Sequence, residues 1–205
     1  MTLDVLGLLA ACSYALDCVE AELVHVTNNH SKRVAYMSVC IAKQMGIQEE
    51  SLQDLAVCAL LHDNALTQYI QEELHNDISQ IAVTQEVPKL GAHCIWGEKN
   101  VAELPFHTDV SDVILYHHEN ADGSGPFGKK WDEIPLFSRI IHLCDLLDIA
   151  CRTKKFAEGT WKVAEQFVQN STGTMFDREC RDAFLRAFSE EQFLSLDRET
   201  FEDQL

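Results

Sequence analysis

The chain has 205 residues, and its 16 Lys plus Arg stand against 33 Asp plus Glu, which gives a formal net charge of -17. Because this charge repels polyanions, we exclude DNA, RNA polymers and anionic membrane surfaces as partners held by electrostatic attraction. The length favours a single domain over residues 1–205 rather than a multidomain assembly. An apolar share of 46% is typical of a chain that buries a globular core.

The sequence predicts neither a membrane span nor a secreted protein. No run approaches the roughly 18 consecutive apolar residues of a membrane helix, and residues 1–4 lack the cationic start of a signal peptide. We therefore expect a cytoplasmic protein. The eight cysteines form no C-x-x-C pair and several lie in apolar, helix-like runs, so we interpret them as buried free thiols to which the sequence assigns no function.

Hydrophobic periodicity predicts an all-α fold. The chain has only nine glycines and four prolines, and no window alternates between apolar and polar residues as a strand would. A first helix over about 3–23 is expected to pack on a core of about 28–158, followed by C-terminal helices over about 160–200. In chain order, the expected helices cover about 3–23, 30–45, 49–62, 66–74, 89–103, 110–118, 135–156, 161–168, 177–188 and 190–196.

Local signals define several of these boundaries. Asn28 or Asn29 is expected to cap the second helix, and Asp109 or Ser111 the helix that ends near residue 118. Pro135 fits the first turn of the long helix that follows. Glycines and a proline in the segment 119–132 predict the longest loop of the chain.

Polar side chains interrupt the apolar faces of these helices at several places. Burying so many polar groups without partners is costly, although each taken singly is more often a core or cap residue. Imidazoles and carboxylates suit iron, manganese or zinc, and together they would satisfy two metal ions that share one bridging carboxylate. The residues concerned are His30, His62, Asp63, His93, His117, His118 and Asp145.

Five motifs in a fixed order strengthen this interpretation. The ordered set resembles the HD-GYP domains, a metal-dependent branch of the HD phosphohydrolase superfamily that acts on cyclic di-GMP. The resemblance covers about residues 3–188 and implies an all-α, HD-domain helical bundle with a buried two-metal centre. The motifs are N-H-S-K-R-V at 29–34, H-D at 62–63, H-x-x-x-G at 93–97, H-H-E-N-A-D-G-S-G at 117–125 and S-R-I-I-H-L-C-D-L-L-D at 138–148.

The resemblance also implies a role for each candidate ligand. One metal would be held by His30, His62, Asp63 and Asp145. Asp63 would bridge to a second metal held by His93, His117 and His118, and His62 and Asp63 are the implied catalytic residues. Iron or manganese is favoured over zinc. Members with a third metal carry a glutamate where this chain has Val26, so two metals are expected.

The substrate contacts depart from the family pattern. Family members continue H-D-I-G-K, whereas Asp63 is followed by Asn64, Ala65 and Leu66, so a phosphate-binding lysine is missing. G-Y-P reads G-P-F at 125–127, and R-P-Y-K/R reads K-K-F-A at 154–157. Lys129 and Lys130 are interpreted as a solvated loop pair rather than replacements. The substrate-binding residues implied by the resemblance are Asp122, Gly123, Gly125, Pro126, Arg139 and Lys154.

The leading hypothesis is a metal-dependent phosphodiesterase that hydrolyses cyclic di-GMP to pGpG, with onward hydrolysis to GMP left open. One alternative is an HD-GYP-like nucleotide-binding or signalling module without turnover, favoured by Leu66 and the altered G-P-F loop. The other is an HD phosphohydrolase for a different nucleotide or phosphate ester. A diguanylate cyclase partner and a homodimer formed through the first helix are further partners to test.

Overall fold

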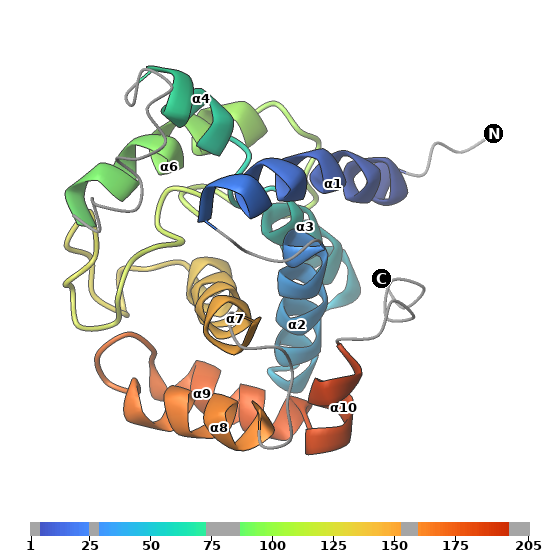
Figure 1. Cartoon of the computed structure of the whole chain (residues 1–205), viewed down its shortest axis with the longest axis vertical. Helices are drawn as coiled ribbons and strands as arrows, with labels where there is room; N and C mark the ends of the chain where they lie inside the picture. The colour runs from blue at the N-terminus through green and yellow to red at the C-terminus, as the bar shows by residue number, and fades with distance from the viewer. Residues whose placement is uncertain (1–4, 25–28, 73–86, 153–159, 197–205) are drawn as a thin grey trace.

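The computed structural model of the protein describes residues 5–24, 29–72, 87–152 and 160–196 (Figure 1). No residue of these ranges is assigned to a β-strand, which confirms the all-α prediction for the part of the chain that is described. The helices are α1 Val5–Val24, α2 His30–Gln44, α3 Glu49–Leu60, α4 Leu66–Glu72, α6 Val87–Val101, α7 Leu136–Arg152, α8 Thr160–Asn170, α9 Arg178–Ala187 and α10 Glu190–Ser195.

Helices α2 and α7 form the centre of the bundle, and α2 also contacts α3 and α9 (Figure 1). Their apolar residues recur at helical spacing, so each helix presents one stripe to the core. On α2 the stripe of Val34, Met37 and Ile41 is fully buried, as are Ile140 and Leu147 on α7. The polar residues predicted at the site interrupt these same stripes, so the fold carries them into its interior.

Helices α8, α9 and α10 cover one end of the bundle, in orange and red in Figure 1. Trp161, Phe184 and Phe193 pack there with ring centroids 5.6 to 6.0 Å apart, the separation of favourable edge-to-face and tilted pairs. The Asp177 side chain accepts a hydrogen bond from the backbone of Cys180 and so caps α9. The predicted C-terminal helices are therefore confirmed.

Helix α1 is joined to α2 by a buried carboxylate. Leu9 and Leu16 pack against the core, and Asp17 is fully buried. Its Oδ1 accepts hydrogen bonds from the backbone N–H of Ser31, at 2.9 Å, and from the Ser31 hydroxyl, at 2.6 Å. Asp17 thus satisfies a backbone donor at the start of α2 that has no partner within the helix.

Asn29 occupies the predicted capping position of α2 but does not cap it with its side chain. Its φ of 64° is left-handed, a conformation that asparagine tolerates, and its side chain makes no capping hydrogen bond. The alternative cap, Asn28, lies outside the described residues. Pro135 differs from expectation by one position, because α7 begins at Leu136.

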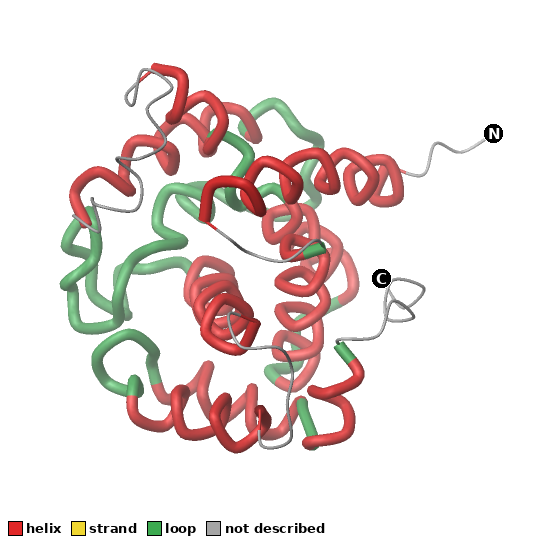
Figure 2. The backbone as a smooth tube through the Cα atoms, viewed as in Figure 1, coloured by secondary structure: helices red, strands yellow, loops and turns green. Residues whose placement is uncertain are grey.

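The helix predicted at about 110–118 is wrong: residues 111–118 form consecutive turns, drawn among the green segments of Figure 2. The Glu98 carboxylate of α6 accepts the backbone N–H groups of Asp112 at 2.7 Å and of Ile114 and Leu115 at 3.1 Å each. The Ile114 and Leu115 donors are therefore not available to the carbonyls of residues 110 and 111, which would accept them in a helix that starts at residue 110. Asp112 also has a left-handed φ of 66°, which interrupts a right-handed helix.

A second carboxylate anchors the same connection closer to α6. Buried Asp54 of α3 accepts the backbone N–H of His107, at 3.0 Å, and the backbone N–H and hydroxyl of Thr108, at 2.6 and 2.7 Å. From α7, the Ser138 hydroxyl donates to the Val113 carbonyl at 2.8 Å. Three helices thus hold a connection that has no helix of its own.

The described residues contain no helix long and apolar enough to cross a bilayer.

Glu98→Ala tests the role of this anchoring. The variant leaves three backbone donors without their charged acceptor, so we expect the free energy of unfolding to fall by about 2–4 kcal/mol. Urea unfolding followed by circular dichroism measures the change. Exposed Glu103 provides the control, because its replacement by alanine should change stability by less than about 0.5 kcal/mol. Equal stability of the two variants would contradict this explanation of the turn segment.

Candidate metal centre

The fold gathers the predicted ligands from segments far apart in the sequence. His30 is the first residue of α2, and the pair at 62–63 follows directly after α3. His93 lies on α6, Asp145 lies on α7, and the pair at 117–118 ends the turn segment that Glu98 supports. All of these side chains are buried or largely buried in the interior of the bundle.

One cluster contains His30, His62 and Asp145, whose potential ligand atoms all lie within 4.8 Å of one another. The His30 Nε2 atom is 3.3 Å from Asp145 Oδ1, and the rings of His30 and His62 have centroids 5.5 Å apart. All three residues are at most 2% exposed. These three residues are among the four that the family resemblance assigns to the first metal.

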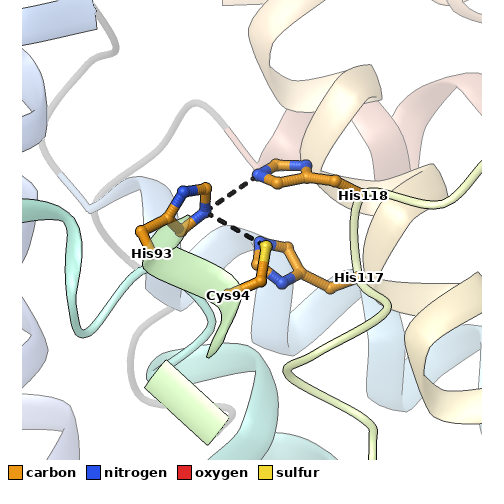
Figure 3. Close-up of side chains that lie close together, drawn as sticks. All are labelled: His93, Cys94, His117 and His118. Atoms are coloured by element: carbon orange, nitrogen blue, oxygen red, sulfur yellow. Dashed lines mark hydrogen bonds between the residues drawn. The ribbon is translucent and has the colours of Figure 1, made fainter. Parts of the chain in front are cut away.

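The second cluster contains His93, His117 and His118, joined by Cys94, and its ligand atoms also lie within 4.8 Å of one another (Figure 3). The Nε2 atoms of His93 and His118 approach to 3.2 Å. The rings of His117 and His118 are tilted against each other with centroids 3.9 Å apart. The three imidazoles therefore converge on a small volume, as the second metal position requires.

Asp63 lies between the two clusters. Its Oδ2 is 3.6 Å from His62 Nε2, on the side of the first cluster. Its Oδ1 is 3.2 Å from His93 Nε2 and 3.5 Å from His117 Nε2, on the side of the second. The two oxygens of one carboxylate thus face different sets of imidazoles, which is the arrangement that a bridging ligand needs.

Hydrogen bonds outside the clusters fix which ring nitrogens face inward. His62 Nδ1 donates to the Ala59 carbonyl at 2.8 Å, and His117 Nδ1 donates to the Ile114 carbonyl at 2.6 Å. The proton on Nδ1 leaves a lone pair on Nε2 of each ring. Both Nε2 atoms are buried without a hydrogen-bond partner, and so is Oδ1 of Asp63.

These partnerless atoms fit divalent cations. Buried polar groups are almost always hydrogen-bonded, so three inward-facing acceptors without donors are costly unless a cation lies among them. Neutral imidazole nitrogens and a carboxylate are metal ligands by chemistry. The described part of the chain contributes two clusters of side chains able to hold such ions.

His30 is oriented by a pair of residues to which the sequence assigned no role. Its Nδ1 is 2.8 Å from Asp148 Oδ2. The Arg33 guanidinium in turn donates to both oxygens of Asp148, at 2.8 Å each. Arg33 and His30 hold the pKa of Asp148 well below its usual value although burial raises it. The carboxylate therefore stays ionised and keeps His30 Nε2 directed at Asp145.

The same surroundings favour positive charge within the clusters. Burial lowers the pKa of His30, but its contacts with Asp145 and Asp148 raise it by more, to well above the usual value. Burial likewise lowers the pKa of His93, while Asp63 and the neighbouring thiol raise it to about 9. The carboxylates thus favour positive charge at these two rings, and bound cations would supply such charge.

Cys94 belongs to the second cluster, which the sequence did not reveal. The thiol is buried, as expected, and its Sγ is 3.6 Å from His93 Nε2 (Figure 3). Burial raises the pKa of Cys94, but the neighbouring His117 and His93 rings lower it to about 7. From the sequence alone, Cys94 is interpreted as one of several buried thiols, because it forms no C-x-x-C pair that would indicate a metal-binding cysteine.

Two small residues explain how the pair at 62–63 is positioned. The Asn64 amide donates to the Leu61 carbonyl at 2.8 Å and to the Gly97 carbonyl at 3.2 Å. A Cβ on Gly97 would approach Asn64 Nδ2 to 3.1 Å and Ile114 Cγ2 to 3.0 Å. Glycine in the H-x-x-x-G motif thus lets α6 approach both segments that carry ligands.

The predicted loop over 119–132 folds around buried Glu119. Its carboxylate accepts the backbone N–H groups of Phe127, at 2.7 Å, and of Lys129, at 2.5 Å. A Cβ on Gly125 would lie 2.5 Å from Glu119 Oε1, so this position requires glycine. Lys129 Nζ is 3.4 Å from Glu133, a partly exposed pair that agrees with the interpretation as a solvated loop residue.

The predicted substrate residues are dispersed around this loop. Asp122 is exposed, and its Oδ1 accepts the Ser124 backbone N–H. Gly123 has a positive φ of 85°, and the Pro126 ring faces Gly91 of α6. Lys154 lies outside the described residues, as does Val26. The structure thus places four of the predicted substrate residues, Asp122, Gly123, Gly125 and Pro126, in the loop without bringing them into the metal clusters.

Arg139 lies apart from the clusters, on α7. It precedes Asp145 by six residues, which places it about 9 Å along the axis and on another face of the helix. Its guanidinium is 3.1 Å from Asp177 and 3.5 Å from Glu179. Its guanidinium lies over the Trp131 ring, and its three partners, Trp131, Asp177 and Glu179, are among the residues that line a pocket of about 570 Å³.

Comparison with known proteins defines the class of protein to which this fold and these clusters belong. A family model described as HD domain matches residues 16–180. The chain therefore belongs to the HD-domain family, which confirms the resemblance and the fold class. It spans less than half of the length of the first curated relatives that it matches.

The relatives share a named activity. A cyclic di-GMP phosphodiesterase response regulator, RpfG of Xanthomonas campestris, is 28% identical over 166 residues, which cover 78% of this chain and 43% of the relative. A 3'3'-cGAMP-specific phosphodiesterase of Vibrio cholerae is 30% identical over 173 residues, or 80% of this chain and 35% of the relative.

A solved structure of a cyclic GMP-AMP-specific phosphodiesterase of Vibrio cholerae, V-cGAP3, superposes with a TM-score of 0.77 at 22% identity. The superposition covers 97% of this chain and 52% of that one. At this identity the likeness establishes the helical fold.

Asp63→Asn tests whether the carboxylate between the clusters binds metal. The amide keeps the shape of the side chain but removes its charge, so we expect loss of at least one of about two bound divalent ions per chain. Elemental analysis after anaerobic loading and desalting measures the content. Asp132→Asn, in an exposed part of the loop, should retain the metal content of the unmodified protein. Full metal content in Asp63→Asn would contradict the bridging role.

Proposed function

We propose that the protein is a metal-dependent cyclic dinucleotide phosphodiesterase that hydrolyses cyclic di-GMP to linear pGpG. One observation carries the proposal: the two oxygens of Asp63 face separate imidazole clusters, in which buried Nε2 atoms have no hydrogen-bond partner. Such a site suits two divalent ions that share one carboxylate. Paired metal ions are suited to displacement at phosphorus because they stabilise both the attacking and the leaving oxygen.

The net negative charge of the protein makes bound cations necessary for binding an anionic substrate. The chain carries a net charge of -17, and a cyclic dinucleotide carries two phosphodiester charges of the same sign. The field of the protein therefore repels the substrate unless the site itself is positive. When bound, two divalent ions would supply that charge and activate a water molecule for in-line attack.

The residues of the chain prepare the site for this chemistry. Backbone carbonyls hold the His62 and His117 rings in the tautomer whose lone pair faces inward. Asp148, fixed by Arg33, does the same for His30. These contacts are made before any ligand arrives, so little reorganisation is needed when metal binds.

The names of the relatives favour cyclic dinucleotides as the substrate class. Cyclic di-GMP is named for the relatives from Xanthomonas campestris and Pseudomonas aeruginosa. The relative from Vibrio cholerae at 30% identity is named for 3'3'-cGAMP, which makes that nucleotide the second candidate. Both substrates present the same phosphodiester to the metals and differ in one base.

A direct assay tests the proposal. The purified chain, loaded anaerobically with Fe²⁺ or Mn²⁺, is incubated with cyclic di-GMP or 3'3'-cGAMP, and the nucleotides are separated by chromatography. We expect linear dinucleotide from cyclic di-GMP, and at least about 100-fold slower turnover by Asp63→Asn. Binding without product would favour a signalling module, and cleavage of other phosphate esters alone would favour a different phosphohydrolase.

Leu66→Lys tests whether the missing cation limits the rate. Leu66 begins α4 and packs against a small apolar cluster around Tyr69 and Trp96. A lysine can keep its stem on this cluster while its ammonium reaches toward substrate phosphate. We expect a lower KM for cyclic di-GMP in Leu66→Lys than in Leu66→Gln, whose side chain is polar and uncharged and one atom shorter than that of lysine. Equal KM values would show that a cation at this position does not contribute.

A further inference from the structure

We propose that the Cys94 thiolate is a ligand of the metal ion held by His93, His117 and His118. The inference deepens the proposed function, because it rests on the metal centre described above. It assigns to the second metal position a sulfur donor that the family resemblance does not imply. The cluster is drawn in Figure 3.

Two distances between donor atoms match those of ligands about 110° apart on one ion. With metal–nitrogen bonds of about 2.05 Å and a metal–sulfur bond of about 2.3 Å, two nitrogens should lie about 3.3 Å apart, and nitrogen and sulfur about 3.6 Å apart. The His93 and His118 Nε2 atoms are 3.2 Å apart, and Cys94 Sγ is 3.6 Å from His93 Nε2. All donor pairs of the cluster lie within 4.8 Å.

A second, independent observation points to a ligand at this place. His117 is fully buried, its Nδ1 donates to the Ile114 carbonyl, and its Nε2 has no hydrogen-bond partner. In Figure 3 the Cys94 sulfur and the three rings converge on one region, with His93 facing the adjacent pair His117 and His118. A cation among these side chains would satisfy the His117 nitrogen and the thiolate together.

Sulfur makes the two metal positions chemically different. The first offers imidazole nitrogens and carboxylate oxygens from His30, His62 and Asp145, which suit iron or manganese. The second offers three nitrogens, one oxygen of the bridging Asp63 and one thiolate, and the sulfur makes this set softer and favours zinc over manganese. We therefore expect the second position to retain zinc in competition with manganese.

Cobalt substitution tests the assignment. Co²⁺ added to the reduced, metal-free chain should give a near-ultraviolet thiolate-to-cobalt charge-transfer band, which Cys94→Ser should lack. The zinc affinity of the second position should fall at least about 10-fold in Cys94→Ser. Loss of a residue that only orients a ligand already lowers metal affinity by about 10-fold or more, and loss of the ligand itself should lower it at least as much. Competition against a chromophoric zinc chelator measures this change.

Matched controls separate Cys94 from the other thiols. Cys12 and Cys18 of α1 are exposed and could bind cobalt adventitiously. The double variant Cys12→Ser/Cys18→Ser should keep both the band and the zinc affinity. Buried Cys180 of α9 belongs to neither cluster, and Cys180→Ser should likewise keep the band.

X-ray absorption at the zinc edge keeps the inference testable if Cys94→Ser does not fold. The unmodified chain loaded with one equivalent of zinc should show one sulfur at about 2.3 Å. Two bound cobalt ions with nitrogen and oxygen donors only would overturn this inference and leave the metal centre intact. Absence of any bound metal would overturn the inference and the metal centre of the proposed function together.

Discussion

The structure depends on one carboxylate that faces two groups of imidazoles inside an apolar bundle. Asp63 has His62 on one side and His93 with His117 on the other, at 3.2 to 3.6 Å. Placing so many polar groups in a core is unfavourable unless each finds a partner, and the Nε2 atoms of His62 and His117 face inward without one. A pair of cations would give these buried polar groups their partners. The stability of the core and the proposed chemistry would therefore both depend on the same two cations.

The rest of the fold positions this arrangement through buried carboxylates. Asp148 orients His30 at the start of α2, while Glu98 and Asp54 hold the irregular segment that ends in the two adjacent histidines. A regular helix there would have consumed its own backbone donors and pointed neighbouring side chains about 100° apart. Turns held from α3, α6 and α7 instead let His117 and His118 converge on the second cluster.

Periodicity and motif order predicted the parts of the site that depend on local pattern. Each predicted ligand lies in a cluster or between the two, because His30, His93 and Asp145 interrupt apolar helix faces that must turn inward. The helix expected at 110–118 does not form, because the Glu98 carboxylate accepts backbone N–H groups that the helix would use and Asp112 has a left-handed φ. The contact of Asp148 with His30 joins residues 118 positions apart, and no local pattern encodes it.

Anomalous diffraction from a crystal of the metal-loaded chain tests the central claim most directly. Data on either side of the metal absorption edge should show two peaks, one among His30, His62 and Asp145 and the other among His93, His117 and His118, with Asp63 between them. A single peak, or peaks bound only by surface carboxylates, would contradict the account of this core as a two-metal centre.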